Sequence, residues 1–176
     1  MPSTTVVAAS LSMYQASVPV FTRAFANLSA ILEKALAHAQ ANGVDPKEFL
    51  EGRLAPDMLP FPRQVQLASD TAKGCVARLA GLDVPSFADT EATFAELQDR
   101  IVKTVAFMQT VDAAQIDGSE RRTISFKAGK SELNFTGQGY LLDFALPNFF
   151  FHVTTAYAIL RHKGAPIGKM DYLGRL

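Results

Sequence analysis

The sequence predicts a mainly α-helical protein: a four-helix bundle with one small β-hairpin inserted before the last helix. Two observations predict this fold. Apolar residues recur at helical spacing in four long stretches, and only one stretch between them changes to alternation. A chain of 176 residues has the length of one domain, and at this size folding buries roughly 70% of the unfolded surface. We therefore expect a single domain over residues 1–176.

The first long helix is expected from about residue 12 to residue 41. Pro19 either kinks this helix or marks its true start, and Asn42-Gly43 is a typical helix end. A short helix is expected over residues 45–50, because Pro46 follows a capping aspartate. The apolar positions that define the first helix are Val20, Phe21, Ala24, Phe25, Leu28, Ile31, Leu32, Ala35 and Leu36.

The second and third long helices follow a connector that is too rich in proline to be helical. The second is expected over residues 62–80 with Gly81 as its stop, and the third from Asp89 or Thr90 to about residue 111. Their buried positions are predicted to be Val65, Ala68, Ala72, Cys75, Val76 and Leu79, then Phe94, Leu97, Ile101, Val105 and Met108. The charged residues of the third helix are expected to face water: Glu91, Glu96, Asp99 and Arg100.

The hairpin is predicted at about residues 121–136. Residues 123–127 and 131–136 alternate between polar and apolar, and Ala128-Gly129-Lys130 between them supplies a turn. Because an isolated hairpin is marginally stable in water, it should pack on the bundle or on a partner.

The last helix is expected from Pro147 to just before Gly164. It is apolar nearly all round as far as Arg161, so we expect it in the centre of the protein. His152 is the exception within this apolar stretch, and a buried histidine is either satisfied structurally or used in function.

Composition excludes several classes of function. The chain has 17 Lys and Arg against 17 Asp and Glu, which argues against a nucleic-acid partner and against attachment to an anionic membrane. No apolar segment approaches the ~20 residues of a membrane span. The apolar run Val6–Ala9 is too short for a signal peptide, and Cys75 is the single cysteine. We expect a cytoplasmic protein.

The three histidines cannot form a metal site by themselves. His152 and His162 are ten residues apart, about 280° round a helix and ~15 Å along it. The positions that could pair with His152 on its own helix hold Thr155 and Ala156, and His38 lies among polar residues of the first helix. A metal would therefore need His152 together with carboxylates from elsewhere, and the alternative is a hydrogen-bonded structural histidine.

The second long helix offers the nearest polar candidates. Gln66, Asp70 and Lys73 share one of its faces, which is either a solvated face or a polar cluster lining a pocket near His152. Asp57 in the connector joins this pocket, caps the helix that follows or fixes Arg53.

Four segments carry a resemblance to a known family: Arg53–Met58, Arg63–Gly74, Pro147–Arg161 and Gly168–Gly174. They resemble an uncharacterised bacterial family, a domain of unknown function placed among the DinB/YfiT-like helical bundles. The resemblance covers nearly the whole chain. It implies a four-helix bundle that is often a homodimer.

The wider superfamily also implies a place for a metal. Members that resemble metal-dependent thiol transferases bind a divalent ion through three histidines, one on the second helix and two spaced by four on the last. His152 falls on one of these positions, Ala156 stands at its partner, and Gln66 or Asp70 stands near the third.

Three functions are compatible with these patterns. The first is a small-ligand or weak-metal pocket near His152, with Zn or Ni as the divalent ion and no tightly bound cofactor. The second is a metal-dependent transferase acting on a low-molecular-weight thiol, and the third is a dimerisation module without chemistry. The predicted metal ligands are His152 and Asp70, and the predicted ligand-binding residues are Asp57, Gln66, Asp70, His152 and Tyr157.

Overall fold

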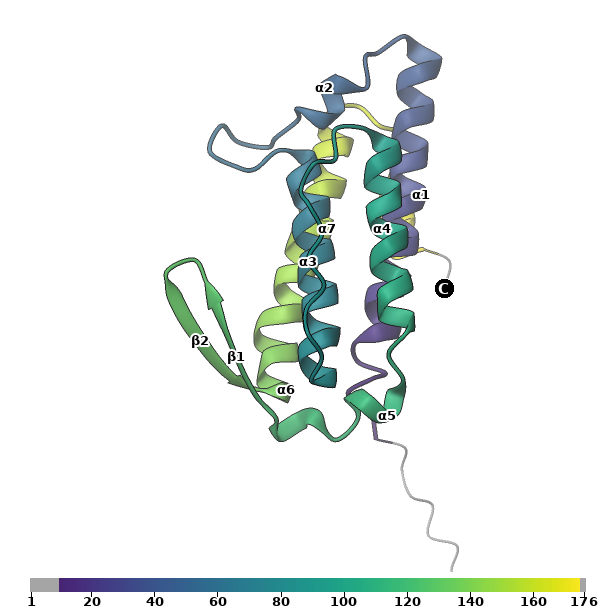
Figure 1. Ribbon diagram of the computed structural model, residues 1–176. Coiled ribbons are helices and arrows are strands. Elements are labelled where there is room, and N and C mark those ends of the chain that lie inside the picture. The colour runs from purple at the N-terminus through teal and green to yellow at the C-terminus, as the bar shows by residue number, and fades with distance from the viewer. Residues whose placement is uncertain (1–9, 175–176) are drawn as a thin grey trace, which may run out of the picture.

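Four long helices lie side by side and form the body of the protein (Figure 1). The structure, a computed structural model, describes residues 10–174, so the apolar run Val6–Ala9 lies outside the described residues. The predicted mainly helical fold with one inserted hairpin is confirmed. The long helices are α1 (Val18–Asn42), α3 (Phe61–Ala80), α4 (Phe94–Gln109) and α7 (Leu146–His162).

The order of the helices round the bundle differs from their order along the chain. Helix α3 packs mainly on α7 and α4, and α1 packs on α4 and α7. Helices α1 and α7 run in one direction, whereas α3 and α4 run in the other (Figure 1). Because α3 and α4 are parallel neighbours, an extended crossover segment, residues 81–93, returns along the whole length of the bundle to join them.

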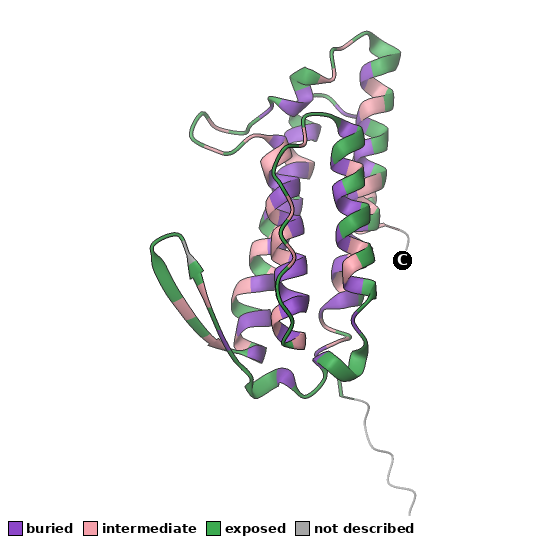
Figure 2. Cartoon of the chain, viewed as in Figure 1, coloured by how far each residue is buried: buried purple, intermediate pink, exposed green. Residues whose placement is uncertain are grey.

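The aromatic cluster around Phe149 fills the centre of the bundle. The Phe149 ring lies edge-on to the rings of Phe21 and Phe25, with centroids 4.8 and 5.1 Å apart. All three side chains are fully buried, as the inner faces of the long helices are in Figure 2. Helix α7 is less central than its composition predicts, because Phe151 is 56% exposed on its outer flank. Each helix of a four-helix bundle keeps an outer face.

Two helices begin later than their apolar patterns predict. Helix α1 begins at Val18, so Pro19 marks its start rather than a kink. Helix α4 begins at Phe94 rather than at residue 89 or 90. The Thr93 hydroxyl accepts a hydrogen bond from the backbone N–H of Glu96 at 3.2 Å, and the Glu96 carboxylate accepts from the N–H of Ala92 at 2.8 Å. This reciprocal cap fixes the start of the helix.

Helical structure begins at Gly137, ten residues before Pro147, where the last helix was expected to start. A short turn, α6 (Gly137–Gly139), leads into the π-helical turn η2 (Tyr140–Ala145) and then directly into α7. Pro147 has no N–H to offer to the carbonyl of Asp143, and the wider turn before it takes up this break.

The hairpin has the predicted strands, β1 (Thr123–Ala128) and β2 (Ser131–Thr136), which pair antiparallel. The rings of Phe126 and Phe135 pack edge-on or tilted against Tyr140 and Phe144 of η2. The guanidinium of Arg78 lies 4.6 Å from the centre of the Phe126 ring. The base of the hairpin is thus anchored on the bundle, while its tip leans away from it (Figure 1).

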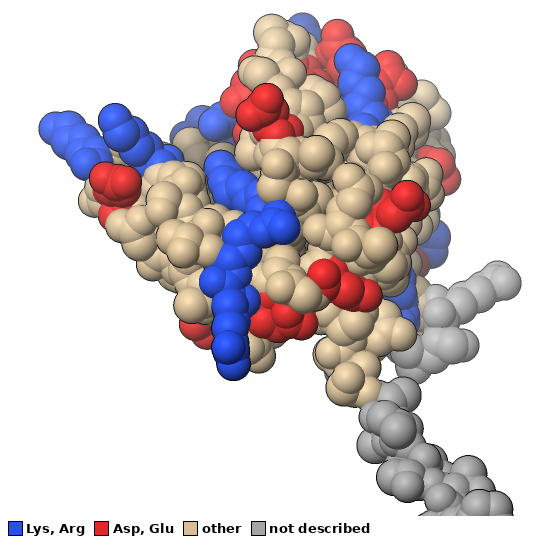
Figure 3. Space-filling view, turned by 60° about the horizontal axis from the view of Figure 1, so that its bottom comes forward, with Lys and Arg blue, Asp and Glu red and all other residues tan. Residues whose placement is uncertain are grey.

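Four short elements complete the fold: α2 (Lys47–Leu50), α5 (Ala113–Ile116), η1 (Ser119–Arg121) and α8 (Lys169–Leu173). Within residues 10–174, no helix combines the length and the apolar character that crossing a membrane requires. Basic and acidic side chains lie interspersed on the face of the molecule shown in Figure 3.

Candidate functional site

His152 lies on α7 at its contact with α3 and is 9% exposed. Its Nδ1 lies 2.8 Å from the Oε1 of Gln64, on α3. The side-chain amide of Gln64 donates its own N–H to the carbonyl of Leu59 at 2.9 Å, which leaves Oε1 as the acceptor toward the ring. Nδ1 must therefore carry the hydrogen of the neutral imidazole.

The second ring nitrogen of His152 is left with a lone pair. Nε2 has no hydrogen-bond partner among residues 10–174, and it keeps some exposure to solvent. Burial, and then the positive charge of Arg63, hold the pKa of His152 below its ordinary value. The ring is thus a neutral base whose orientation is fixed from the Nδ1 side.

We expect His152 to make stability depend on pH in a definite direction. Its folded-state pKa is lowered, so the unfolded chain binds the proton more readily than the folded protein does. The free energy of unfolding should therefore fall as pH drops below the ordinary value of 6.5 and level off below the folded pKa. Urea titrations across this range should show the loss in wild type, and His152→Gln should lack that part of it. An equal slope in both proteins would contradict the assignment.

Asp70 and Gln66 do not lie with His152. On α3, Asp70 lies about 120° round the helix from Gln64, and Gln66 lies about 160° from it. Asp70 binds Arg100 of α4 at 2.8 Å, and Gln66 donates to Glu91 at 2.7 Å. Both side chains face α4 and the crossover segment, whereas Gln64 faces α7.

Asp57 and Tyr157 lie apart from His152 and also apart from Asp70 and Gln66. Asp57 is exposed in the connector, where Arg53 donates instead to the carbonyl of Met58 at 3.1 Å. The Tyr157 ring packs edge-on to Tyr172 of α8 with centroids 5.8 Å apart, about 140° round α7 from His152. The structure therefore divides the five predicted ligand-binding residues between separate places.

The donors around His152 do not fit a tightly held transition metal. The ring offers one free nitrogen, its neighbour Gln64 offers an amide already used in two hydrogen bonds, and Ala156 follows one turn later. No group of three or more His, Cys, Asp or Glu residues between positions 10 and 174 is arranged to hold an ion. Stable transition-metal sites generally need three or four such donors.

Gln64 is the partner of His152 that the periodicity could have identified. It lies four residues before Ala68, and Ala72 follows four residues later, so it occupies the same buried face of α3 as they do. A polar side chain on an otherwise apolar stripe needs a partner inside the protein. In this structure the partner is His152.

Arg100 corrects an expectation, because it is buried rather than facing water. It is 2% exposed and lies on the inner face of α4 with Leu97 and Thr104. Its Nη1 donates to the carbonyl of Ala88 and to the carboxylate of Glu91, both at 3.0 Å. Its Nη2 binds Asp70, so Arg100 joins the crossover segment to α3.

The ions around Arg100 balance one another. Lys73 binds Asp70 at 2.9 Å, Arg100 also pairs with Asp89 at 3.0 Å, and Arg63 pairs with Asp89 too. Burial alone would raise the pKa of Asp89, but the hydrogen bond from Arg63 and the charge of Arg100 bring it below its usual value. The three cations and three carboxylates of this ion cluster are Arg63, Lys73, Arg100, Asp70, Asp89 and Glu91.

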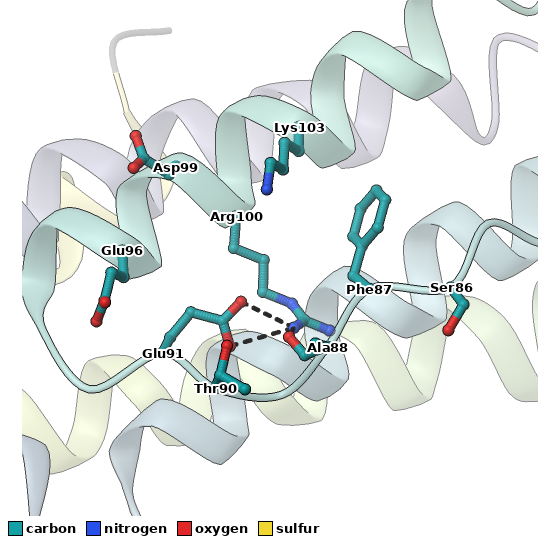
Figure 4. A pocket seen from close by; sticks show the side chains of 9 residues that line it. All are labelled: Ser86, Phe87, Ala88, Thr90, Glu91, Glu96, Asp99, Arg100 and Lys103. Carbon is teal, nitrogen blue, oxygen red and sulfur yellow. Dashed lines mark hydrogen bonds and ion pairs between the residues drawn. The ribbon is translucent and has the colours of Figure 1, made fainter.

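A polar hollow of about 300 Å³ lies beside the ion cluster, between α4 and the crossover segment (Figure 4). Its walls include Arg100, Lys103 and the ring of Phe87. Phe87 also lies 5.1 Å from the Lys73 ammonium, so it covers part of the cluster. The carboxylates of the ion cluster are already paired with Arg100. The main role of the cluster is therefore to hold the crossover segment in place.

The helical bundle with its inserted hairpin has a DinB-like fold. The family DUF1993, a domain of unknown function, matches residues 13–173, and the chain belongs to this family. A crystal structure of a DinB family member protein from Shewanella denitrificans is similar, with 40% identity and a TM-score of 0.84. The match covers 93% of this chain and 92% of that one. No curated protein matches the chain.

Proposed function

We propose that this protein binds a small molecule through Nε2 of His152. The observation that supports the proposal is the chain of hydrogen bonds from the Leu59 carbonyl through Gln64 to Nδ1. These hydrogen bonds fix the tautomer that is protonated at Nδ1, and they leave Nε2 unprotonated. Nε2 has no partner among the described residues and keeps some exposure to solvent, so it is the ring atom that can accept a hydrogen from a ligand.

The chemistry of the site favours a ligand that donates a hydrogen. A neutral imidazole nitrogen accepts a hydrogen bond or a proton from an O–H, N–H or S–H group. The nearby charge of Arg63 opposes a cation at this place and favours an anion or a neutral molecule. Low-molecular-weight thiols satisfy both conditions, since a neutral thiol donates its S–H and places no positive charge at the ring. We place this binding in the cytoplasm.

The tautomer can be tested directly. Long-range ¹H–¹⁵N correlation spectra of ¹⁵N-labelled protein should show the protonated nitrogen of His152 at Nδ1 and the bare one at Nε2. Replacing Gln64 with leucine removes the acceptor, so the ring should become a mixture of tautomers. Gln98→Leu is the matched control, because Gln98 of α4 also donates to a backbone carbonyl at 2.9 Å, that of Ser29, and should leave the His152 signals unchanged. A wild-type ring protonated at Nε2 would contradict the proposal.

Binding is tested with the same spectra and with calorimetry. Cysteine and glutathione should shift the Nε2 resonance of the wild type, and calorimetry should show binding to the wild type and none to His152→Gln. Zn²⁺ and Ni²⁺ provide the metal arm, and we expect sub-stoichiometric binding of either ion. Stoichiometric metal that is lost in His152→Gln would replace the proposal with a metal site, and an Nε2 signal that no thiol shifts would refute thiol binding.

A further inference from the structure

A second, apolar groove lies on the other flank of α7, where α1, α7 and α8 meet. It has a volume of about 380 Å³, which is within the range of small-molecule sites. Its apolar walls are formed by Val20, Ala24, Phe150, Val153, Tyr172 and Leu173. His152 is not on its walls, so this groove is independent of the function proposed above.

One cation lies on the wall of this groove. Arg23 is exposed, and the one hydrogen bond it makes among the described residues is from Nη2 to the carbonyl of Leu173, at 3.1 Å. Asn27, one turn further along α1, donates in the same way to the carbonyl of Tyr172 at 3.0 Å. The guanidinium has five N–H donors, so most of them stay available for a ligand.

The walls of the groove offer no carboxylate to Arg23. Helix α7 contains no acidic residue between Leu146 and His162. The single acid of α1 is Glu33, about 15 Å along the helix from Arg23. The single acid of α8 is Asp171, which is already paired with Lys34 and with the N–H of Gly168. The positive charge of Arg23 therefore lies beside the apolar groove and has no acidic partner on α1, α7 or α8.

We propose that this groove binds an amphiphile with an anionic head, such as a medium-chain carboxylate. The head pairs with Arg23, and the hydrocarbon chain lies on Val20, Phe150 and Val153. An arginine binds a carboxylate through two parallel hydrogen bonds, which gives both affinity and orientation. The apolar walls contribute in proportion to the area that the chain covers.

Decanoate below its micellar concentration is the test ligand, and calorimetry is the measurement. Decanoate should bind one to one, and 1-decanol should bind about tenfold more weakly, because it lacks the charge. Arg23→Gln should weaken decanoate about tenfold. Arg53→Gln is the matched control: that arginine is also exposed and also donates to a backbone carbonyl at 3.1 Å, but it lies outside the groove.

A second variant tests the apolar walls. Val20→Trp should fill the groove and abolish decanoate binding, while His152→Gln should bind decanoate as wild type does. Melting curves show whether each variant is folded, and decanoate should raise the melting temperature of wild type and of Arg53→Gln but not of Arg23→Gln. Equal binding of decanoate and decanol, or equal binding by wild type and Arg23→Gln, would overturn the inference. So would a dimer that Val20→Trp converts to a monomer, since a second copy would then cover the groove.

Discussion

Replacing Arg100 with methionine is expected to lower the free energy of unfolding by about 3 kcal/mol. Methionine fills a similar volume, so the loss comes from the charge and not from a cavity. Asp70, Asp89 and Glu91 would lose their shared partner, as would the carbonyl of Ala88. Glu91 is the least exposed of the three carboxylates, with 12% of its side chain accessible, so its desolvation should account for most of the effect.

Chemical denaturation measures this loss, and Lys103→Met is the matched control. Lys103 lies almost one turn further along α4, is exposed and forms no ion pair with the described residues. Its replacement should change stability by less than about 0.5 kcal/mol. Limited proteolysis should also cut Arg100→Met faster than wild type within residues 81–93. If both variants are as stable as wild type, the crossover segment is held by other contacts.

Replacing Phe149 with alanine is expected to destabilise the protein by about 4 kcal/mol. The ring is fully buried and packs edge-on with Phe21 and Phe25, so its removal leaves a cavity between α1 and α7. Phe151→Ala, two residues away, removes the same ring from a position that is 56% exposed. Urea unfolding should show a loss of less than about 1 kcal/mol for that control. Similar losses in the two variants would mean that the orientation of α7 is wrong.

The secondary structure could be predicted because local patterns determine most of it. Apolar residues every three or four positions identified α1, α3, α4 and α7, and strict alternation identified both strands of the hairpin. The start of α4 was misplaced, because Asp89 and Thr90 are also good capping residues. The reciprocal cap between Thr93 and Glu96 sets the start of α4, and the sequence contains the corresponding T-x-x-E motif.

The candidate site was predicted less completely, since it depends on which faces of the helices meet. His152 stood out as the one imidazole in the apolar stretch before Arg161. Its partner Gln64 was missed in favour of Gln66 and Asp70, which are only two and six residues away but face α4. Arg100 was assigned to water from its residue type alone. Its burial depends on carboxylates from α3 and from the crossover segment, which spacing within α4 cannot reveal.

The parallel arrangement of α3 and α4 has a consequence for how the chain folds. In an up-and-down bundle each helix can first pair with the next one along the chain as a local hairpin. In this protein the antiparallel neighbours are α1 with α4 and α3 with α7, and neither pair is consecutive among the long helices. The native pairs must close long loops before they gain contacts, so folding should be slower than for an up-and-down bundle of equal length. The hairpin, by contrast, pairs two strands that are separated by a short turn only.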